Sequence, residues 1–142
     1  MREKYFKLTA LLTKGKDIPL LAIRLVLAYG FYEPAMKKLN NIDAIIKWFE
    51  SMELPMPALN AYMATATESI GVLLLVLGFG VRIISLPLII TMLVAIKTVH
   101  FANGFAAGEN GYEIPFYYII MLFTLLIYGG GNIGIDYFLR KK

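Results

Sequence analysis

Long apolar runs alternate with short polar segments along this chain of 142 residues. A helix needs roughly 20 mostly apolar residues to cross a bilayer, and four runs approach that length, at residues 18–39, 58–78, 82–102 and 112–128. The very short turn Phe79-Gly80-Val81 makes the second and third runs antiparallel neighbours. The pattern predicts an all-α integral membrane four-helix bundle with a single domain over residues 1–142.

The segment between the first two runs has an amphipathic pattern. Apolar residues recur at helical spacing over residues 42–52, with charged residues on the opposite side. Such a helix lies in the membrane interface, where Trp48 is a suitable anchor. We expect an amphipathic interfacial helix between spans 1 and 2. The polar and basic N-terminal segment predicts a second surface helix, whose apolar face includes Leu8 and Leu11.

The composition agrees with a membrane protein and excludes several functional classes. Hydrophobic residues make up 58% of the chain, which is more than a water-soluble domain of this size buries. The absence of cysteine excludes disulfides and thiolate chemistry. No soluble basic face is apparent, so we expect no nucleic-acid partner. The lipid bilayer is the expected partner, and stripes of small residues in span 2 allow a homo-oligomer.

The basic residues also predict an orientation. Nine lysines and arginines belong to the N-terminus, the turn between spans 2 and 3, and the C-terminus. The opposite side has three, namely Lys37, Lys38 and Lys47, of which the first two are expected to extend to the headgroups. By the positive-inside rule, both termini are expected to be cytoplasmic. The loop over residues 103–111 then faces outward.

Ionisable residues inside the spans are the candidates for function. Lys97 and His100, the only histidine, lie near the end of span 3. Arg24 and Glu33 lie in span 1, and Glu68 lies near the middle of span 2. Charges at membrane depth are costly unless they are paired or face a polar cavity. We therefore expect these groups to have partners within the bundle.

Matching depths predicts which of these groups meet. At a rise of about 1.5 Å per residue, Glu33 and Lys97 lie about 9 and 7 Å from the outer ends of their spans. His100 and Glu113 lie at the outer ends of spans 3 and 4. The depths of Arg24 and Glu68 differ by about 7 Å. Three pairs follow: Arg24–Glu68, Glu33–Lys97 and His100–Glu113. The predicted outward-facing polar pocket contains Glu33, Lys97, His100, Asn103, Glu113 and Tyr117.

Structural roles for the same residues stay open. Arg24 and Glu68 would also serve as a clamp that fixes helix register. Lys97 could extend outward without a partner, and His100 could cap span 3. In span 4, we expect a semi-polar stripe beginning with Glu113 and Tyr117 to face inward.

Several short motifs in fixed order resemble those of a known family. They are Arg24-Leu25-Val26-Leu27, Leu54-Pro55-x-Pro57, Glu68-Ser69-Ile70-Gly71, Gly78-x-Gly80-x-Arg82, Thr98-Val99-His100-x-x-Asn103-Gly104 and Gly111-Tyr112-Glu113-x-Pro115. Together they resemble the DoxX family of small four-helix bacterial membrane proteins. The segment from Tyr29 to Met36 departs from the His-Gly type motif of that family and resembles its HvfX branch.

The resemblance implies an accessory protein of a metal or redox stress system in the bacterial inner membrane. The HvfX branch is associated with copper-binding modified peptides and their maturation enzyme, so the first hypothesis is support of maturation or export of such a peptide, without an activity of its own. The alternative is a subunit of a quinone-linked oxidoreductase of the thiosulfate:quinone type, with a quinone near His100, Glu113, Tyr117 and Lys97. A transporter ranks lower, because no inverted repeat is evident.

The sequence assigns no catalytic residue and no metal site. Direct binding of copper would fall to His100, Met121 and Glu113. One histidine without cysteine makes a poor set of copper or haem ligands.

Overall fold

The chain forms helices throughout its described part. A computed structural model describes residues 2–141, except the side chains of Leu8, Leu11 and Lys14. The main helices are α1 (Arg2–Lys14), α2 (Asp17–Asn40), α3 (Ile42–Ser51), α4 (Pro57–Leu77), α5 (Val81–Ala95), α6 (Glu113–Tyr128) and α7 (Ile135–Arg140). A π-helix, η1 (Ile96–His100), and two 3₁₀ turns, η2 (Phe101–Asn103) and η3 (Ala107–Glu109), lie between α5 and α6. No strand occurs in these residues, which confirms the predicted all-α class.

Three of the four predicted spans are long and apolar enough to cross a membrane. They are Asp17–Asn40, Pro57–Leu77 and Val81–Asn103, the last continuing from α5 through η1 and η2. Helix α6 has 16 residues and rises about 24 Å, which is less than the roughly 30 Å of a hydrocarbon core. Its length is set at the C-terminal end by Gly129, whose φ of +77° ends the helix. A count of four spans is therefore not established.

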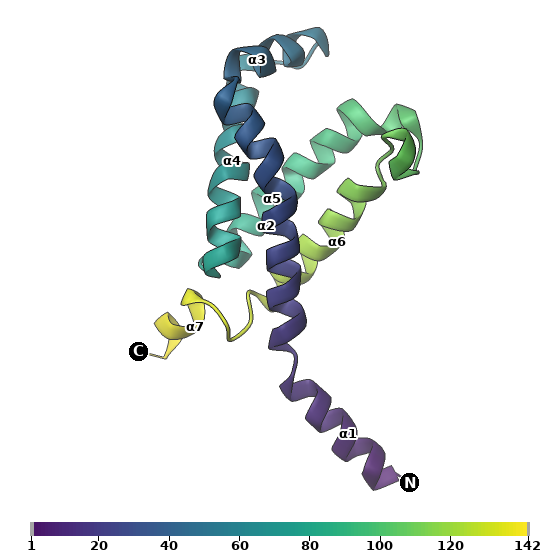
Figure 1. Cartoon of the computed structure of the whole chain (residues 1–142), viewed down its shortest axis with the longest axis vertical. Coiled ribbons are helices and arrows are strands. Elements are labelled where there is room, and N and C mark those ends of the chain that lie inside the picture. Colours follow the sequence, from purple (N-terminus) through teal and green to yellow (C-terminus); the bar gives the residue numbers. More distant parts are fainter. Residues whose placement is uncertain (1, 142) are drawn as a thin grey trace.

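Two helix pairs form the bundle. Helix α2 packs along α4, and α5 packs along α6, with weaker contacts from α4 to α5 and from α2 to α6. The two pairs approach each other near α7 and diverge toward the end that carries α3 and η1–η3 (Figure 1). One cluster of buried side chains joins the pairs, including Leu27, Phe31, Leu75, Leu88 and Leu122.

The short helices lie at the two ends of the bundle. Helix α3 has the amphipathic character that the sequence predicted for this connector, and it packs against α4. Helix α1 projects away from the bundle at the opposite end (Figure 1). The side chains of Leu8 and Leu11, placed on the predicted apolar face of α1, lie outside the described residues, as does Lys142.

Arg24 is a structural residue at the end of the bundle near α7, where the two helix pairs approach each other. We call this the closed end. Its guanidinium is buried and donates hydrogen bonds to the carbonyls of Leu75 at 2.8 Å, Val76 at 2.9 Å and Gly130 at 2.9 Å, and to that of Ile133. The last carbonyls of a helix have no partner within it, so Arg24 satisfies two from α4 and joins them to the segment before α7. The predicted Arg24–Glu68 pair is therefore wrong.

Candidate functional site

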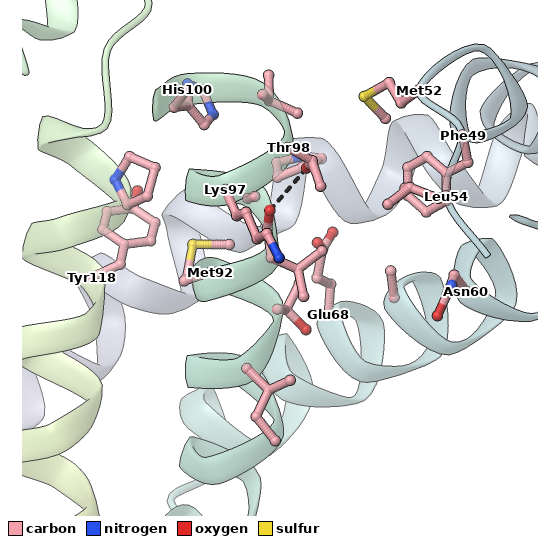
Figure 2. Close-up of a pocket in the computed structure, with 18 of the residues that line it drawn as sticks. Phe49, Met52, Leu54, Asn60, Glu68, Met92, Lys97, Thr98, His100 and Tyr118 are labelled. Atoms are coloured by element: carbon pink, nitrogen blue, oxygen red, sulfur yellow. Dashed lines mark hydrogen bonds between the residues drawn. The ribbon is translucent and has the colours of Figure 1, made fainter. Parts of the chain in front are cut away.

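A large pocket lies where the two helix pairs diverge. It has a volume of about 800 Å³ and is lined by residues of α2, α3, α4, α5, η1 and α6. Figure 2 shows Phe49, Met52 and Leu54 approaching from the α3 side, and Met92, Lys97 and His100 from α5 and η1. Ligand pockets in proteins usually have volumes of 300–1,000 Å³. The pocket is therefore the candidate functional site.

The π-helix η1 positions the two basic residues that the sequence singled out. The amide of Phe101 donates to the carbonyl of Ile96, five residues back. Single π-helical turns within α-helices occur often at functional sites. This turn carries both Lys97 and His100, and both line the pocket.

The hydrogen bond of His100 fixes its neutral tautomer. Nδ1 of His100 lies 2.8 Å from the carbonyl oxygen of Asn110. A carbonyl oxygen only accepts, so Nδ1 carries the hydrogen and Nε2 of the neutral ring has a free lone pair. Nδ2 of Asn103 donates to the same carbonyl at 3.2 Å. Asn103 thus helps to hold the loop, but it does not line the pocket.

A buried ion pair forms part of the pocket wall. Nζ of Lys38 lies 2.7 Å from Oε2 of Glu68, with side-chain exposures of 13% and 4%. Both residues line the pocket. Burying a carboxylate is costly without such a partner. The sequence predicted that Lys38 would extend to the headgroups, but it turns inward to Glu68.

Glu33 lies outside the pocket. Its Oε1 pairs with Nζ of Lys37 at 2.7 Å, and the two side chains are 74% and 72% exposed. The two residues are one helical turn apart on α2, a common spacing for surface pairs. The predicted Glu33–Lys97 pair is therefore wrong, because Glu33 is on the outer face of α2 and Lys97 is at the pocket.

Glu113 and Tyr117 form a separate local arrangement at the start of α6. Glu113 accepts hydrogen bonds from the amide of Ala107 at 2.9 Å and the hydroxyl of Tyr117 at 3.0 Å. Neither residue lines the pocket. Tyr117 is exposed, and the buried side of α6 is formed by Pro115, Leu122 and Leu125. The predicted His100–Glu113 pair is therefore wrong, and of the predicted inward stripe Tyr117 and Tyr128 are exposed while Met121 packs against the core.

The rest of the lining is mainly apolar and was not predicted as a site. It includes Trp48 and Phe49 of α3, and Met52, Met63 and Met92. Tyr118 lines the pocket because Gly30 of α2 leaves room for its ring, which would clash with a Cβ there. The predicted copper ligands Met121 and Glu113 are absent from this lining, and Met121 packs against the core. The amphipathic pattern of α3 was the available signal, since it places Phe49 and Met52 on one side.

Comparison with known proteins identifies the family. Length, hydropathy and the helical fold define the chain as a small all-helical membrane protein. Residues 19–101 match the DoxX family, and the chain belongs to that family.

Two relatives extend the comparison over most of the chain. An uncharacterized protein of Haemophilus influenzae is 30% identical over 135 residues, covering 89% of this chain and 87% of the relative. A Bacillus subtilis protein named "Putative oxidoreductase CatD" is 26% identical over 130 residues, covering 92% and 93%. No solved structure matches the chain.

Proposed function

We propose that the pocket binds a lipophilic redox molecule of the quinone class, and that the protein is a membrane subunit of an oxidoreductase system. The observation that carries the proposal is the pocket itself. It combines a mainly apolar lining with Lys97 and His100 on η1. The name of the Bacillus subtilis relative supports a redox role.

The lining fits such a molecule. Apolar and aromatic side chains suit a ring and an isoprenoid tail, and a few polar groups suffice to orient the ligand. The ammonium of Lys97 would donate a hydrogen bond to a ring carbonyl. Nε2 of neutral His100 would accept one from a ring hydroxyl, because Nδ1 is held by Asn110. When bound, a quinone would supply the two-electron chemistry that the side chains lack.

The buried pair would contribute a fixed polar wall. Lys38 is the only hydrogen-bond partner of the Glu68 side chain among the described residues. The second carboxylate oxygen is thus available to a proton or to water in the pocket. We assign Glu68 a role in accepting a proton near the ligand, and Lys38 a role in stabilising the carboxylate form that accepts it.

Trp48 provides the test, because it is the only tryptophan and lines the pocket. Purified protein in nanodiscs is titrated with a short-chain ubiquinone while the fluorescence of Trp48 is recorded. We expect saturable quenching, and about tenfold weaker binding after Lys97→Met or His100→Asn, equivalent to losing one charged or well-placed hydrogen bond. Glu33→Gln, outside the pocket, is the matched control.

Two results would reject the quinone proposal. One is quenching that rises linearly with quinone and never saturates, as expected for collisions within the lipid. The other is a saturating curve that is identical in the wild-type protein and in both pocket variants.

A second candidate function follows from the methionines. Met52, Met63 and Met92 line the same pocket as His100, and thioether and imidazole groups are suitable ligands for copper(I). We propose, as the alternative, that the pocket receives a copper-carrying peptide and supports its maturation or export. The HvfX-like segment from Tyr29 to Met36 contributes Gly30 and Pro34 to the lining.

Titration with copper(I) against a chromophoric chelator separates the two candidates. The peptide proposal expects that replacing all three lining methionines by leucine weakens copper binding, whereas Met121→Leu does not. Copper binding that is absent, or unchanged in the triple variant, would remove this candidate. Quinone quenching should survive the same triple replacement, because leucine keeps the lining apolar.

We also propose a location in the bacterial inner membrane with both termini in the cytoplasm. Support comes from the distribution of basic residues. Helix α1, the turn between α4 and α5, and helix α7 lie at one end, and α3 lies at the other (Figure 1). The pocket would then open toward the outer half of the membrane.

A further inference from the structure

A second pocket lies at the closed end of the bundle, away from the candidate site. It has a volume of about 380 Å³ and lies between the α4–α5 turn, the segment after α6, and α7. Its lining comprises Gly80, Arg82, Ile83, Gly129, Asp136, Leu139 and Arg140. Two arginines thus converge on a concave surface whose other walls are mainly backbone and aliphatic side chains.

The walls of this pocket are held by hydrogen bonds rather than by loose loops. The amides of Gly80 and Val81 donate to the carboxylate of Asp136 at 2.9 and 3.3 Å. The amide of Asp136 donates to the carbonyl of Gly78 at 3.0 Å. Helix α7 is therefore fixed against the α4–α5 turn, and Arg140 is held on the same side as Arg82.

The two guanidinium groups are not neutralised by a carboxylate in the described part of the chain, and Nε of Arg140 donates to the backbone carbonyl of Asp136 at 3.3 Å. No ion pair involving Arg82 or Arg140 occurs among the residues that the structure describes. The one carboxylate in the pocket, that of Asp136, is engaged by the two backbone amides. Gly129 permits the close approach of Arg82, since a Cβ there would lie 3.2 Å from its Nε.

The surroundings indicate which anion fits. Ile83 is 81% exposed and Leu139 is 58% exposed, and each is adjacent in sequence to one of the two arginines. In a membrane protein such residues face acyl chains, whereas arginines at the interface face headgroups. Arginine binds phosphate through two parallel hydrogen bonds. A soluble anion has no acyl chain, so contact with Ile83 and Leu139 would not strengthen its binding.

We propose that this pocket binds the phosphodiester headgroup of an anionic phospholipid from the leaflet on the side of the termini. Arg82 and Arg140 hold the phosphate, and Ile83 and Leu139 contact the first part of the acyl chains. Basic pockets between helices on the cytoplasmic side recognise such lipids. The site is independent of the quinone proposal, because the two pockets share no residue.

The test is native mass spectrometry of the full-length protein in detergent, titrated with phosphatidylglycerol, with phosphatidylcholine, and with phosphatidylglycerol plus inorganic phosphate. We expect saturable binding of phosphatidylglycerol that phosphatidylcholine does not reproduce and inorganic phosphate does not displace. The R82Q/R140Q variant should bind about 25-fold more weakly, from about fivefold per basic residue. The control is K4Q/K7Q, which removes the same charge from α1.

Four results would overturn the proposal. An equal loss of binding in R82Q/R140Q and K4Q/K7Q would mean attraction to the whole basic end. Displacement of the lipid by millimolar inorganic phosphate would assign the pocket to a free anion. Unchanged binding in R82Q/R140Q would exclude the pocket altogether. If that variant unfolds at a lower temperature than the wild type, R82K/R140K is measured in its place, because it keeps the charge but lacks the paired donors of arginine. We expect it to bind several-fold more weakly. Wild-type affinity in R82K/R140K would also reject the site.

Discussion

At the scale of single residues, the described part of the protein buries its charges in two ways. Arg24 uses its guanidinium to satisfy four backbone carbonyls. Glu68 instead pairs with one lysine at 2.7 Å and stays in contact with the pocket. The first arrangement uses nearly every donor of the arginine, which is typical of a structural role. The second leaves acceptor capacity free, which suits a functional one.

Replacing Arg24 by lysine should destabilise the protein. Lysine keeps the charge, but its single nitrogen cannot reach the carbonyls of both α4 and the segment before α7. Buried acceptors left without donors cost about 1–3 kcal/mol each, and we expect a loss of about 3 kcal/mol in the free energy of unfolding. Denaturant unfolding in detergent measures it. The control is Arg82→Lys, an exposed position, and an equal effect of both substitutions would contradict the assigned role of Arg24.

At the scale of elements, the turn between α4 and α5 determines how the two helix pairs meet. Gly78 and Gly80 both have left-handed backbones, with φ of +66° and +58°. They differ in what lies beside them. A Cβ on Gly78 would come within 2.7 Å of the Arg24 guanidinium, whereas nothing lies within 4 Å of one on Gly80. Of these two glycines, only Gly78 therefore lies against Arg24 and its hydrogen bonds.

The two glycines form a matched pair for mutation. Gly80→Ala should cost about 1 kcal/mol, which is the strain of a left-handed backbone in a residue other than glycine. Gly78→Ala should cost at least about 2 kcal/mol more, because it also displaces the guanidinium from its carbonyls. Thermal unfolding of both variants in the same detergent measures the difference. Equal costs would mean that Arg24 adjusts freely and does not fix the turn.

At the scale of the whole molecule, hydrophobic pattern predicted the all-α class, the amphipathic connector and the short α4–α5 turn. These features are determined by residues that are close in sequence, and the spacing of apolar residues along the chain reports such local structure. The three charge pairs were wrong because counting residues from a span end gives depth and not direction around the helix. Glu33 and Lys38 both lie in the last two turns of α2, yet Glu33 faces outward and Lys38 reaches Glu68. The pocket was predicted only through Lys97 and His100, since its apolar lining resembles a core.

The orientation is testable in intact cells, because the natural chain has no cysteine. A cysteine at Glu109, in the segment between η1 and α6, should react with a membrane-impermeant maleimide in whole cells. A cysteine at Lys4 of α1 should react only after the cells are opened, since nine basic residues favour a cytoplasmic side for that end. The reverse pattern would place the pocket toward the cytoplasm.

Photoaffinity labelling tests the binding of a quinone in the pocket most directly. The full-length protein in nanodiscs is irradiated with a photoreactive short-chain quinone, and the labelled peptides are identified by mass spectrometry. We expect labels in α3 and in the segment from Met92 to His100, and their disappearance with excess unmodified quinone. Labels spread over the exposed faces of α4, α5 and α6, and unaffected by the competitor, would contradict a quinone site.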